Sequence, residues 1–393
     1  MAKSFRRGML NSALPVSALV AGLFAPLSAS AQTQIGQIFN PEGPAPLFGP
    51  GALVGSVDNP PNGTSAGAIE AIAADPGNAK ILYAGAVNGG IWKSVDGGAT
   101  WTALTDQKSS LSIASLSLDP TDATHKTVIA GNGNTSNGGF ASGSLFSTPA
   151  NFGGVQNGIL YSTDAGATFT RLGASTFARQ SVTDVQARGS TILAATFEPR
   201  VIETGASFFT GGFFRSTDGG KTFVQGATGL PPGPITSLVG DPANPNTFYA
   251  AVTASSGATL GQTGVYKSSD GGASWTAVFT AAQSGGTITS GAQTTIKLTA
   301  GPNGTVAAGV VNIGQGQITG LFYSSTNGAS WTQLDTPAVN GGMQAPVNLA
   351  LAIDPKNRNV VYVSGDNRRL KCPRHRQGQR RRRQRQPDYS VGR

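Results

Sequence analysis

The chain has 393 residues, of which 55 are glycine and only 12% are charged, a composition typical of many short strands joined by tight turns. Its formal net charge of +9 is unevenly spread: eleven of the 28 basic residues lie in 368–393, and Lys3, Arg6 and Arg7 lie near the start. With Asp366 and Asp388 also set aside, the rest of the chain holds 14 basic and 17 acidic residues, which excludes nucleic acid as the expected partner. The single cysteine, Cys372, excludes a disulfide framework.

The N-terminus has the pattern of a secretory signal peptide. A positive region is followed by a mostly apolar run, Ala13–Leu27, and Ala29-Ser30-Ala31 fits the small-residue cleavage pattern. We expect residues 1–31 to be cleaved after Ala31, which makes the protein secreted, periplasmic or cell-surface. A membrane anchor is the alternative, but the run is short and contains two prolines. No later stretch is apolar for long enough to span a bilayer, so no transmembrane segment is expected after signal removal.

Residues 32–66 are rich in Pro and Gly and are expected to form an irregular lead-in, with one strand around Leu47–Val54. From residue 67 onward, a unit of one strand, an Asp-Pro type turn and a second strand recurs. The first copy runs from Ala68 through Asp75-Pro76 to Gly85. Further copies begin at Ile113, Val182, Ile235, Thr295 and Leu349.

A second unit follows the first five of these copies. In its first copy, Gly90–Trp101, apolar and polar residues alternate, the chain turns at Asp-Gly-Gly, and an aromatic residue follows. The residue before the Ser, such as Lys93 or Arg215, is expected to face water. Further copies begin at 158, 212 and 264, and a degraded one begins at 320, where Thr326 replaces the Asp. The complete copies share Ser94, Asp96, Gly98 and Trp101; Ser162, Asp164, Gly166 and Phe169; Ser216, Asp218, Gly220 and Phe223; and Ser268, Asp270, Gly272 and Trp275.

This pattern, Ser-x-Asp-x-Gly-x-Thr/Ser-Trp/Phe, resembles the Asp-box, or BNR, repeat of sialidase-like, sortilin-like and xyloglucanase-like propellers. The steps between copies, 52 to 68 residues, suit one four-stranded blade per repeat. The resemblance implies an all-β fold: a β-propeller of four-stranded Asp-box blades, five complete plus an incomplete sixth, in residues 67–366. It specifies the fold better than the function, since this fold hosts enzymes, receptors and assembly factors.

The Asp of each copy is interpreted as a turn residue. At the head of a Gly-rich turn, its carboxylate can accept hydrogen bonds from the backbone amides that it faces. A metal or catalytic array is the alternative, but one Asp per blade would be spread around a ring. We therefore expect these acids to be structural, with no metal and no cofactor, since the sequence carries no motif for either.

Ligand binding is expected at the connections between the second and third strands of the blades. These connections are predicted to be long and irregular, and they share the face opposite the Asp-Pro and Asp-box turns. The candidate ligand-binding loops are 132–157 and 198–211, and 312–319 is a shorter connection of the same kind. The first loop carries three aromatic residues that could serve as platforms for sugar rings: Phe140, Phe146 and Phe152.

Glycoside hydrolysis needs two carboxyl groups that face each other across the sugar, about 5–10 Å apart. The family comparison does not favour catalysis, because the sialidase Arg-Ile-Pro motif is absent and Val87 stands where xyloglucanase-type enzymes carry an Asp. His125 lies in an Asp-Pro type turn, on the structural face. Five acids remain as weak catalytic candidates: Glu70, Asp106, Asp184, Glu198 and Glu203.

These observations favour an exported, non-catalytic β-propeller that acts as a binding scaffold for a glycan or an extracellular protein at the cell surface. The alternative is a sialidase-like or xyloglucanase-like glycoside hydrolase. A second alternative is a periplasmic assembly factor. The sequence does not name the ligand.

Residues 367–393 depart from the repeat. The sixth blade follows the pattern up to Gly365, and the composition then changes to a basic run that includes Arg380–Arg383, with no Asp-box. A solvated basic tail that binds an anionic surface is one interpretation. We expect instead a disordered, frameshifted or truncated end, because the change falls in the middle of a blade, where it would leave a strand edge unpaired.

Overall fold

The computed structural model of the chain describes residues 47–48, 64–65, 69–87, 89–133, 158–178, 180–201, 207–253, 261–289, 294–337 and 345–365. The chain divides into two units, Met1–Glu42 and Gly43–Arg393, and all the described residues lie in the second. The expected signal peptide, most of the lead-in and the basic tail lie outside the described residues, so their boundaries stay predictions. No helix among the described residues has the length and apolar character that a membrane crossing requires.

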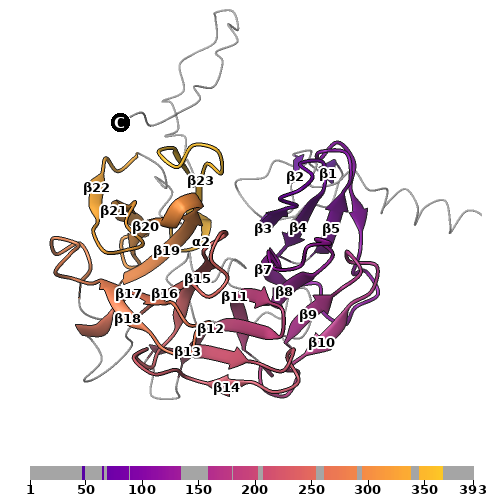
Figure 1. Ribbon diagram of the computed structural model, residues 1–393, viewed down its shortest axis with the longest axis horizontal. Helices are drawn as coiled ribbons and strands as arrows, with labels where there is room; N and C mark the ends of the chain where they lie inside the picture. The colour runs from indigo at the N-terminus through magenta and orange to yellow at the C-terminus, as the bar shows by residue number, and fades with distance from the viewer. Residues whose placement is uncertain are drawn as a thin grey trace, which may run out of the picture. The chain divides into compact units, whose positions relative to one another are not determined.

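The regular secondary structure of the described residues consists almost entirely of antiparallel sheets (Figure 1). Five of the sheets have four strands, each hydrogen-bonded to the next in chain order, and we number them first to fifth along the chain. The first two sheets consist of β3 (Ile69–Ala74), β4 (Leu82–Ala86), β5 (Gly90–Ser94) and β6 (Thr102–Ala103), and of β7 (Ile113–Leu118), β8 (Val128–Asn132), β9 (Ile159–Ser162) and β10 (Thr170–Leu172).

The later sheets repeat this order. The third and fourth consist of β11 (Ser181–Arg188), β12 (Thr191–Val201), β13 (Ser207–Ser216) and β14 (Val224–Gln225), and of β15 (Ile235–Gly240), β16 (Phe248–Val252), β17 (Gly264–Ser268) and β18 (Thr276–Phe279). The fifth consists of β19 (Thr294–Gly301), β20 (Thr305–Asn312), β21 (Gln317–Ser324) and β22 (Thr332–Leu334), and the sixth of β23 (Ala350–Ile353) and β24 (Val361–Ser364). The remaining elements are the pair β1 (Leu47–Phe48) and β2 (Thr64–Ser65), the 3-10 turn η2 (Pro302–Gly304) and α2 (Ala345–Asn348).

The first strands of neighbouring sheets lie side by side: β3 contacts β7, β7 contacts β11, β11 contacts β15, β15 contacts β19, and β19 contacts β23. Four-stranded antiparallel sheets that succeed one another in this way have the architecture of a β-propeller. The predicted all-β class and the four-stranded sheets are thus confirmed, and the blade number of the whole protein stays a prediction. Among the described strands, β3 and β23 do not share an interface like those of consecutive sheets.

The hydrophobic core consists of layers between neighbouring sheets. Tyr83 of the first sheet packs with Leu116 and Leu160 of the second, and similar layers follow at the next three junctions. The junction of the fifth and sixth sheets has a smaller layer that includes Val311 and Leu349. Because successive side chains of a strand point to opposite faces, one sheet contributes to two layers. Each large side chain that is buried in this way stabilises the fold by about 1.5–3 kcal/mol.

The connections between second and third strands differ from the sequence prediction in two sheets. Segment 198–211 was expected to be an irregular loop, but β12 and β13 extend through most of it and pair as far as Val201 and Ser207. Segment 312–319 is likewise a tight hairpin turn between β20 and β21. Cross-strand pairing thus continues past the point where the repeat ends.

Candidate functional site

Each Asp-box turn is closed by one set of hydrogen bonds. In the first copy, Ser94 Oγ donates to Asp96 Oδ1 at 2.8 Å and accepts from the Gly98 amide at 2.8 Å. Asp96 also accepts from the Thr100 amide at 2.9 Å and from the Thr100 hydroxyl at 2.6 Å. The other complete copies repeat this set at Asp164, Asp218 and Asp270. Every oxygen of these carboxylates therefore has a partner inside its own turn.

The same hydrogen bonds hold the acids in their charged form. Bonds from the hydroxyl and the amide of Thr100 lower the pKa of Asp96 to about 2, and Thr168 does the same for Asp164. The Thr222 bonds place the pKa of Asp218 well below its ordinary value. At Asp270, partial burial opposes the shift, but bonds from Ser274 and Ser268 still lower the pKa to about 2. An acid with so low a pKa is a poor proton donor at neutral pH.

The degraded fifth copy keeps the turn with a hydroxyl in place of the carboxylate. Thr326 Oγ1 accepts from the Ser330 amide at 2.9 Å and lies 2.8 Å from the Ser330 hydroxyl. Ser324 Oγ accepts from the Gly328 amide at 3.0 Å, as its counterparts do. The geometry of this turn therefore does not require a charge.

The residue before the Ser of each box was expected to face water, and the structure corrects this expectation. Lys93 is half-buried, and its Nζ donates at 3.0 Å to the carbonyl of Ala165, which lies in the Asp-box turn of the next sheet. Arg215 Nε donates at 2.8 Å to the equivalent carbonyl of Gly271. The long apolar stems of these side chains cover the junction while their charged ends find carbonyl oxygens. They connect sheets and are not free to bind a ligand.

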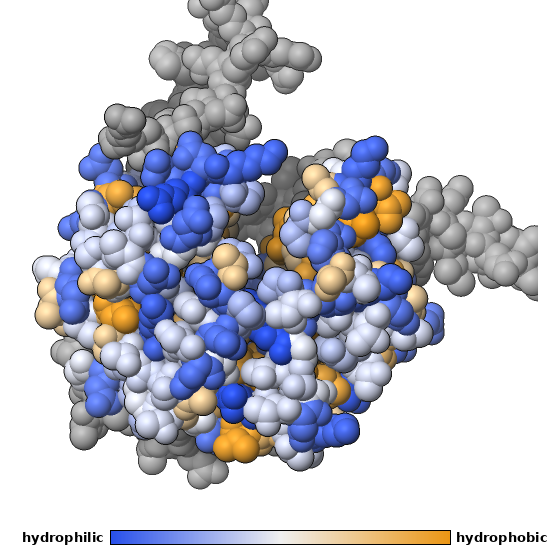
Figure 2. All heavy atoms as spheres, viewed as in Figure 1, coloured by the Kyte–Doolittle hydropathy of each residue, from blue (hydrophilic) through white to orange (hydrophobic). Residues whose placement is uncertain are grey.

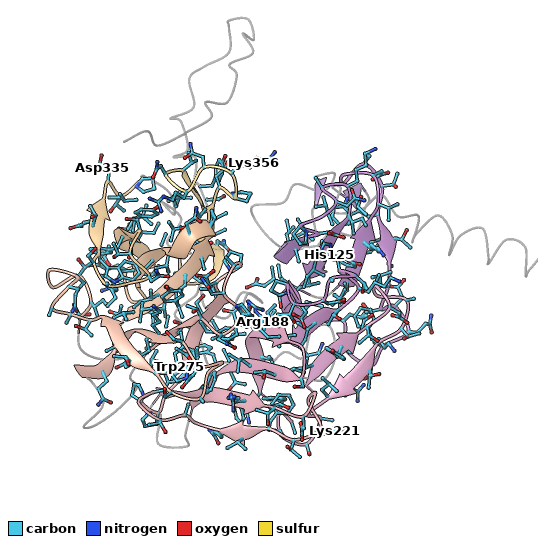
Figure 3. The ribbon with its side chains drawn as sticks, viewed as in Figure 1. His125, Arg188, Lys221, Trp275, Asp335 and Lys356 are labelled. Atoms are coloured by element: carbon cyan, nitrogen blue, oxygen red, sulfur yellow. The ribbon has the colours of Figure 1, made fainter. Side chains whose placement is uncertain are left out.

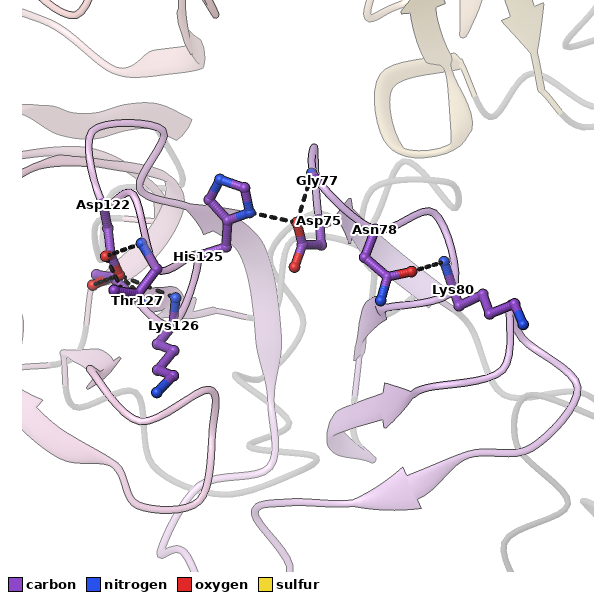
Figure 4. A network of polar contacts seen from close by, with 9 residues as sticks. Asp75, Gly77, Asn78, Lys80, Asp122, His125, Lys126 and Thr127 are labelled. Carbon is purple, nitrogen blue, oxygen red and sulfur yellow. Dashed lines mark hydrogen bonds and ion pairs between the residues drawn. The ribbon is translucent and has the colours of Figure 1, made fainter.

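The Asp-Pro type turns also join neighbouring sheets (Figure 4). Asp75 Oδ1 accepts from the Gly77 amide of its own turn at 2.8 Å and lies 2.7 Å from His125 Nδ1, in the turn of the second sheet. Asp119 Oδ2 accepts from the Gly189 amide of the third sheet at 2.6 Å. His125 is thus a partner of a structural carboxylate, on the face where the sequence placed it.

Arg188 takes the position in the third sheet that Asp119 and Asp241 hold in the sheets on either side. It lies at the end of β11, beside β15 (Figure 3). Its Nη1 donates to the Ala187 carbonyl at 2.7 Å, and its guanidinium lies 5.1 Å from the centroid of the Phe248 ring. Burial lowers the pKa of Arg188 to about 10, and the charges of both aspartates oppose that shift.

Polar side chains on the first strands of the third and fourth sheets bridge these strands to the next sheet. Thr183 Oγ1 donates to the carbonyl of Ile235 at 3.1 Å, and Thr236 Oγ1 donates to the carbonyl of Ile296 at 3.1 Å. Both threonines lie at a register shift between the first and second strands, where one extra residue is inserted, and Glu70 of β3 lies at the same shift. These bulges turn polar side chains out of the regular pairing and toward the neighbouring strand.

Asp184 is a catalytic candidate with a raised pKa. Its Oδ2 accepts from the Leu238 amide of the next sheet at 2.7 Å. Part of the residue stays accessible, but its carboxyl lies among the first strands, and burial raises its pKa to about 6. The positive charge of Lys297 and the hydroxyl of Ser237 lower this pKa, and the negative charge of Glu70 raises it. Glu70, Asp184 and Lys297, from β3, β11 and β19, therefore share one electrostatic environment, which we call the inner-strand cluster.

The other catalytic candidates do not join this cluster. Asp106 is exposed in the turn that follows β6. Glu198 pairs with Thr210 in β12 and β13, and Glu203 lies outside the described residues. The loop 134–157, with its three phenylalanines, also lies outside them. Within the part of the chain that the structure describes, no three His, Cys, Asp or Glu residues are grouped so that they could hold a metal ion.

The β12–β13 hairpin extends beyond its own sheet. The pairing of β11 with β12 ends at Phe197, and β14 pairs with β13 only from Phe214 onward, so residues 198–201 and 207–211 pair only with each other among the described strands. At the base, Gly211 has a φ of +149°, and a Cβ there would collide with the Thr196 carbonyl. Residues 198–201 and 207–211 thus form a two-stranded extension of the third sheet, and we call the segment 198–211 the hairpin arm.

Sequence reasoning did not identify two of the residues that shape these sites. Lys297 affects Asp184 from two sheets away, and Arg188 replaces an Asp in the turn repeat. A signal existed for each, because both differ from most of their counterparts in the repeat. Ala71, Ser115 and Ser237 hold the position of Lys297 in the first, second and fourth sheets, and Asp184 itself holds it in the third. A charged residue at a position that is small in most sheets indicates a function specific to that sheet.

No protein-family model and no curated protein sequence matches the chain. Similar solved structures include an ancestral GH74 enzyme (17% identity, TM-score 0.48, 76% of this chain and 34% of the other). A GH74 xyloglucanase from Xanthomonas campestris has 19% identity and a TM-score of 0.48, over 78% of this chain and 43% of the other. YCF48 bound to D1 peptide has 16% identity and a TM-score of 0.44, over 76% and 75%. The chain thus spans less than half the length of the two GH74 structures.

Proposed function

We propose that this protein is an exported, non-catalytic binding scaffold that engages a glycan or an extracellular protein through the hairpin arm. The arm carries the proposal, because its described residues, 198–201 and 207–211, continue the β12–β13 pairing beyond the rest of their sheet. In its register Arg200 lies opposite Phe208 and Pro199 lies opposite Phe209. Aromatic residues and arginine are the residue types that most often dominate binding interfaces.

The fate of the other charged groups supports a scaffold. The Asp-box carboxylates are engaged within their turns, and Lys93 and Arg215 are bound to neighbouring sheets. Binding on such a framework falls to connections that the sheets do not need for their own packing. Export follows from the signal-peptide pattern and is part of the same proposal.

The test is to replace residues 199–209 by Asn-Gly, a two-residue turn that would close the hairpin between Glu198 and Thr210. Thermal unfolding should be nearly unchanged, because the described residues among those removed, 199–201 and 207–209, pair only with each other. Binding to a glycan array and to a peptide array should be lost. A matched control, Val224→Ser, alters an exposed residue of the same sheet outside the arm. Unchanged binding by the shortened protein would place the site elsewhere.

Glycoside hydrolysis is a second candidate function, and the raised pKa of Asp184 is the observation that favours it. A carboxyl group that titrates near neutral pH is suited to act as a general acid, and Glu70 is close enough to influence it. The chain should then cleave at least one substrate from a panel of polysaccharides and sialosides, and Asp184→Asn should abolish that activity while Asp106→Asn retains it. The absence of turnover on the whole panel would count against this candidate.

A further inference from the structure

Among the described residues, the sheets at the two ends of the series each expose a large side chain on one face. In β23 and β24, exposed residues alternate with covered ones, and Tyr362 is 51% exposed. In the first sheet, Ile72 of β3 is 68% exposed. Figure 2 shows hydrophobic atoms at the surface over this first sheet. We define the sixth-sheet face as Ala350, Ala352, Tyr362 and Ser364, and the first-sheet face as Ile72, Ala74, Leu82 and Trp92. On the first-sheet face, Ile72 and Ala74 are exposed, Leu82 and Trp92 are half-buried, and the small Ala84 beneath them is buried.

The sixth-sheet face repeats a face that is covered elsewhere in the chain. Tyr362 pairs with Ala352 as Tyr83 pairs with Ala73 in the first sheet. In the same register, Ala350 corresponds to Ala71. Ala71, Ala73 and Tyr83 pack against the second sheet, and Tyr83 is only 1% exposed. Tyr362 therefore has the neighbours and the register of a residue that is buried at an inter-sheet junction.

The first-sheet face likewise has the residue pattern of the face that, in the later sheets, packs against the preceding sheet. Ile72 pairs with Ala84 as Leu116 pairs with Ala130. Leu116 packs against Tyr83 of the preceding sheet. The residues that hold the Ile72 position in the second to fifth sheets are all at most 8% exposed: Leu116, Val185, Leu238 and Leu298.

We infer that the sixth-sheet face of one copy of this chain packs on the first-sheet face of a second copy, in a head-to-tail interface. The two faces are the two sides of a junction type that the chain forms between its own consecutive sheets. Within the described residues, β3 and β23 of one chain do not form such a junction. A second copy presents the matching face with the same residue pattern.

One substitution in the pattern fits this interface. Ser364 stands where the first sheet has Gly85, and a Cβ added at Gly85 would lie 2.5 Å from Ile113 of the second sheet. The third and fourth sheets hold Ala195 and Ala251 at this position, fully covered by the next sheet. A small side chain at the position is therefore compatible with a close junction.

A head-to-tail interface joins two different surfaces of the chain, so variants that each lose one surface should behave differently alone and when mixed. Ile72→Asp destroys the first-sheet face and Tyr362→Asp destroys the sixth-sheet face. Each variant alone should be monomeric, because a charge would be buried at its interface. Their equimolar mixture should form a one-to-one dimer, because Ile72→Asp retains the sixth-sheet face and Tyr362→Asp retains the first-sheet face.

The experiment is light scattering coupled to size-exclusion chromatography, over a range of concentrations of the full chain. The unmodified chain should associate as its concentration rises, and so should the control Val224→Asp, which alters a residue that is equally exposed, at 68%, on the outer strand β14. Circular dichroism checks the fold, and Ala74→Asp, also an exposed residue of β3, replaces Ile72→Asp if the latter does not fold.

Three results would overturn the inference. The unmodified chain could stay monomeric at every concentration, which would mean that each copy covers its own faces. Association could persist in both Ile72→Asp and Ala74→Asp, which would place the contact elsewhere. The two variants could each lose association and fail to pair when mixed, which would exclude a head-to-tail arrangement.

Discussion

Asp184 Oδ2 accepts a hydrogen bond of 2.7 Å from the backbone amide of Leu238, on the first strand of the next sheet. Burial raises the pKa of this carboxyl to about 6, and the charge of Lys297 opposes the shift. The native state therefore binds the proton more tightly than the unfolded chain, in which an Asp titrates near pH ~4. The resulting contribution to stability is complete below pH ~4 and is lost as the pH rises through ~6.

Asp184→Asn should remove this pH dependence. Relative to the unmodified chain, the free energy of unfolding of the variant should increase by up to about 3 kcal/mol between pH ~4 and pH ~7, since one pKa unit corresponds to about 1.4 kcal/mol. Urea unfolding at the two pH values measures the difference, and Asp106→Asn is the exposed control. The Asp-box acids do not interfere, because a pKa of about 2 at Asp96 means that their contribution is lost only at lower pH. If the difference in free energy of unfolding between Asp184→Asn and the unmodified chain did not change with pH, the raised pKa assigned to Asp184 would be wrong.

The Asp-box acids should behave as turn residues, and the fifth copy indicates how. Thr326 keeps the bond to the Ser330 amide with a hydroxyl alone. Asp218→Thr should therefore lower the melting temperature less than Asp218→Ala, which leaves the Thr222 amide and hydroxyl without their acceptor. Neither change should alter binding by the folded protein. Equal melting temperatures for the two variants would show that the hydroxyl does not replace the carboxylate.

The parts of this fold that the sequence predicts are the local ones. The Asp-box hairpin depends on Ser94, Asp96 and Thr100, which lie within a few positions of one another, so the pattern and the geometry coincide. Contacts between sheets leave no comparable trace. Lys93 has the polarity of an exposed residue, but its burial depends on how closely the second sheet approaches.

The candidate sites show the same division. Asp184 could be proposed from its acidic side chain and its strand, whereas its electrostatic partners Lys297 and Glu70 come from strands that only the packing of five sheets brings near. The hairpin arm was predicted as a loop because Pro199 and the glycines of 198–211 are typical of loops. Pairing of β12 with β13 outweighs that local preference, since cross-strand bonds continue once a register is set.

Lys93 should stabilise the junction of the first and second sheets. Lys93→Met keeps the apolar stem and removes the bond to the Ala165 carbonyl, so the loss should be on the order of 1 kcal/mol. Lys267→Met is the matched control, because Lys267 holds the same position in its own Asp-box, and no hydrogen bond of its side chain is found among the described residues. Chemical unfolding compares the two. A loss at Lys267 as large as that at Lys93 would mean that the cross-sheet bond contributes nothing specific.

Arg188 should be required for the stability of the fold, because its positive charge lies between those of two aspartates. Its guanidinium packs over the Phe248 ring, and the charges of Asp119 and Asp241 both act on it. Arg188→Met should cost on the order of 2 kcal/mol, from the lost cation–π contact and the lost bond to the Ala187 carbonyl.

Arg188→Asp restores the residue that the neighbouring sheets carry at this position, yet it should be the more damaging change. It would align three carboxylates along adjacent turns, where no described cation replaces the guanidinium. Its additional loss relative to Arg188→Met should depend only weakly on salt, because Asp119 and Asp241 are buried (3% and 1% exposed) and salt screens buried charges less than exposed ones. Urea unfolding in low and high salt measures this, with the exposed Lys221→Met as the control. If Arg188→Asp were as stable as Arg188→Met in low salt, the repeat would tolerate its usual residue here, and the electrostatic role assigned to Arg188 would be wrong.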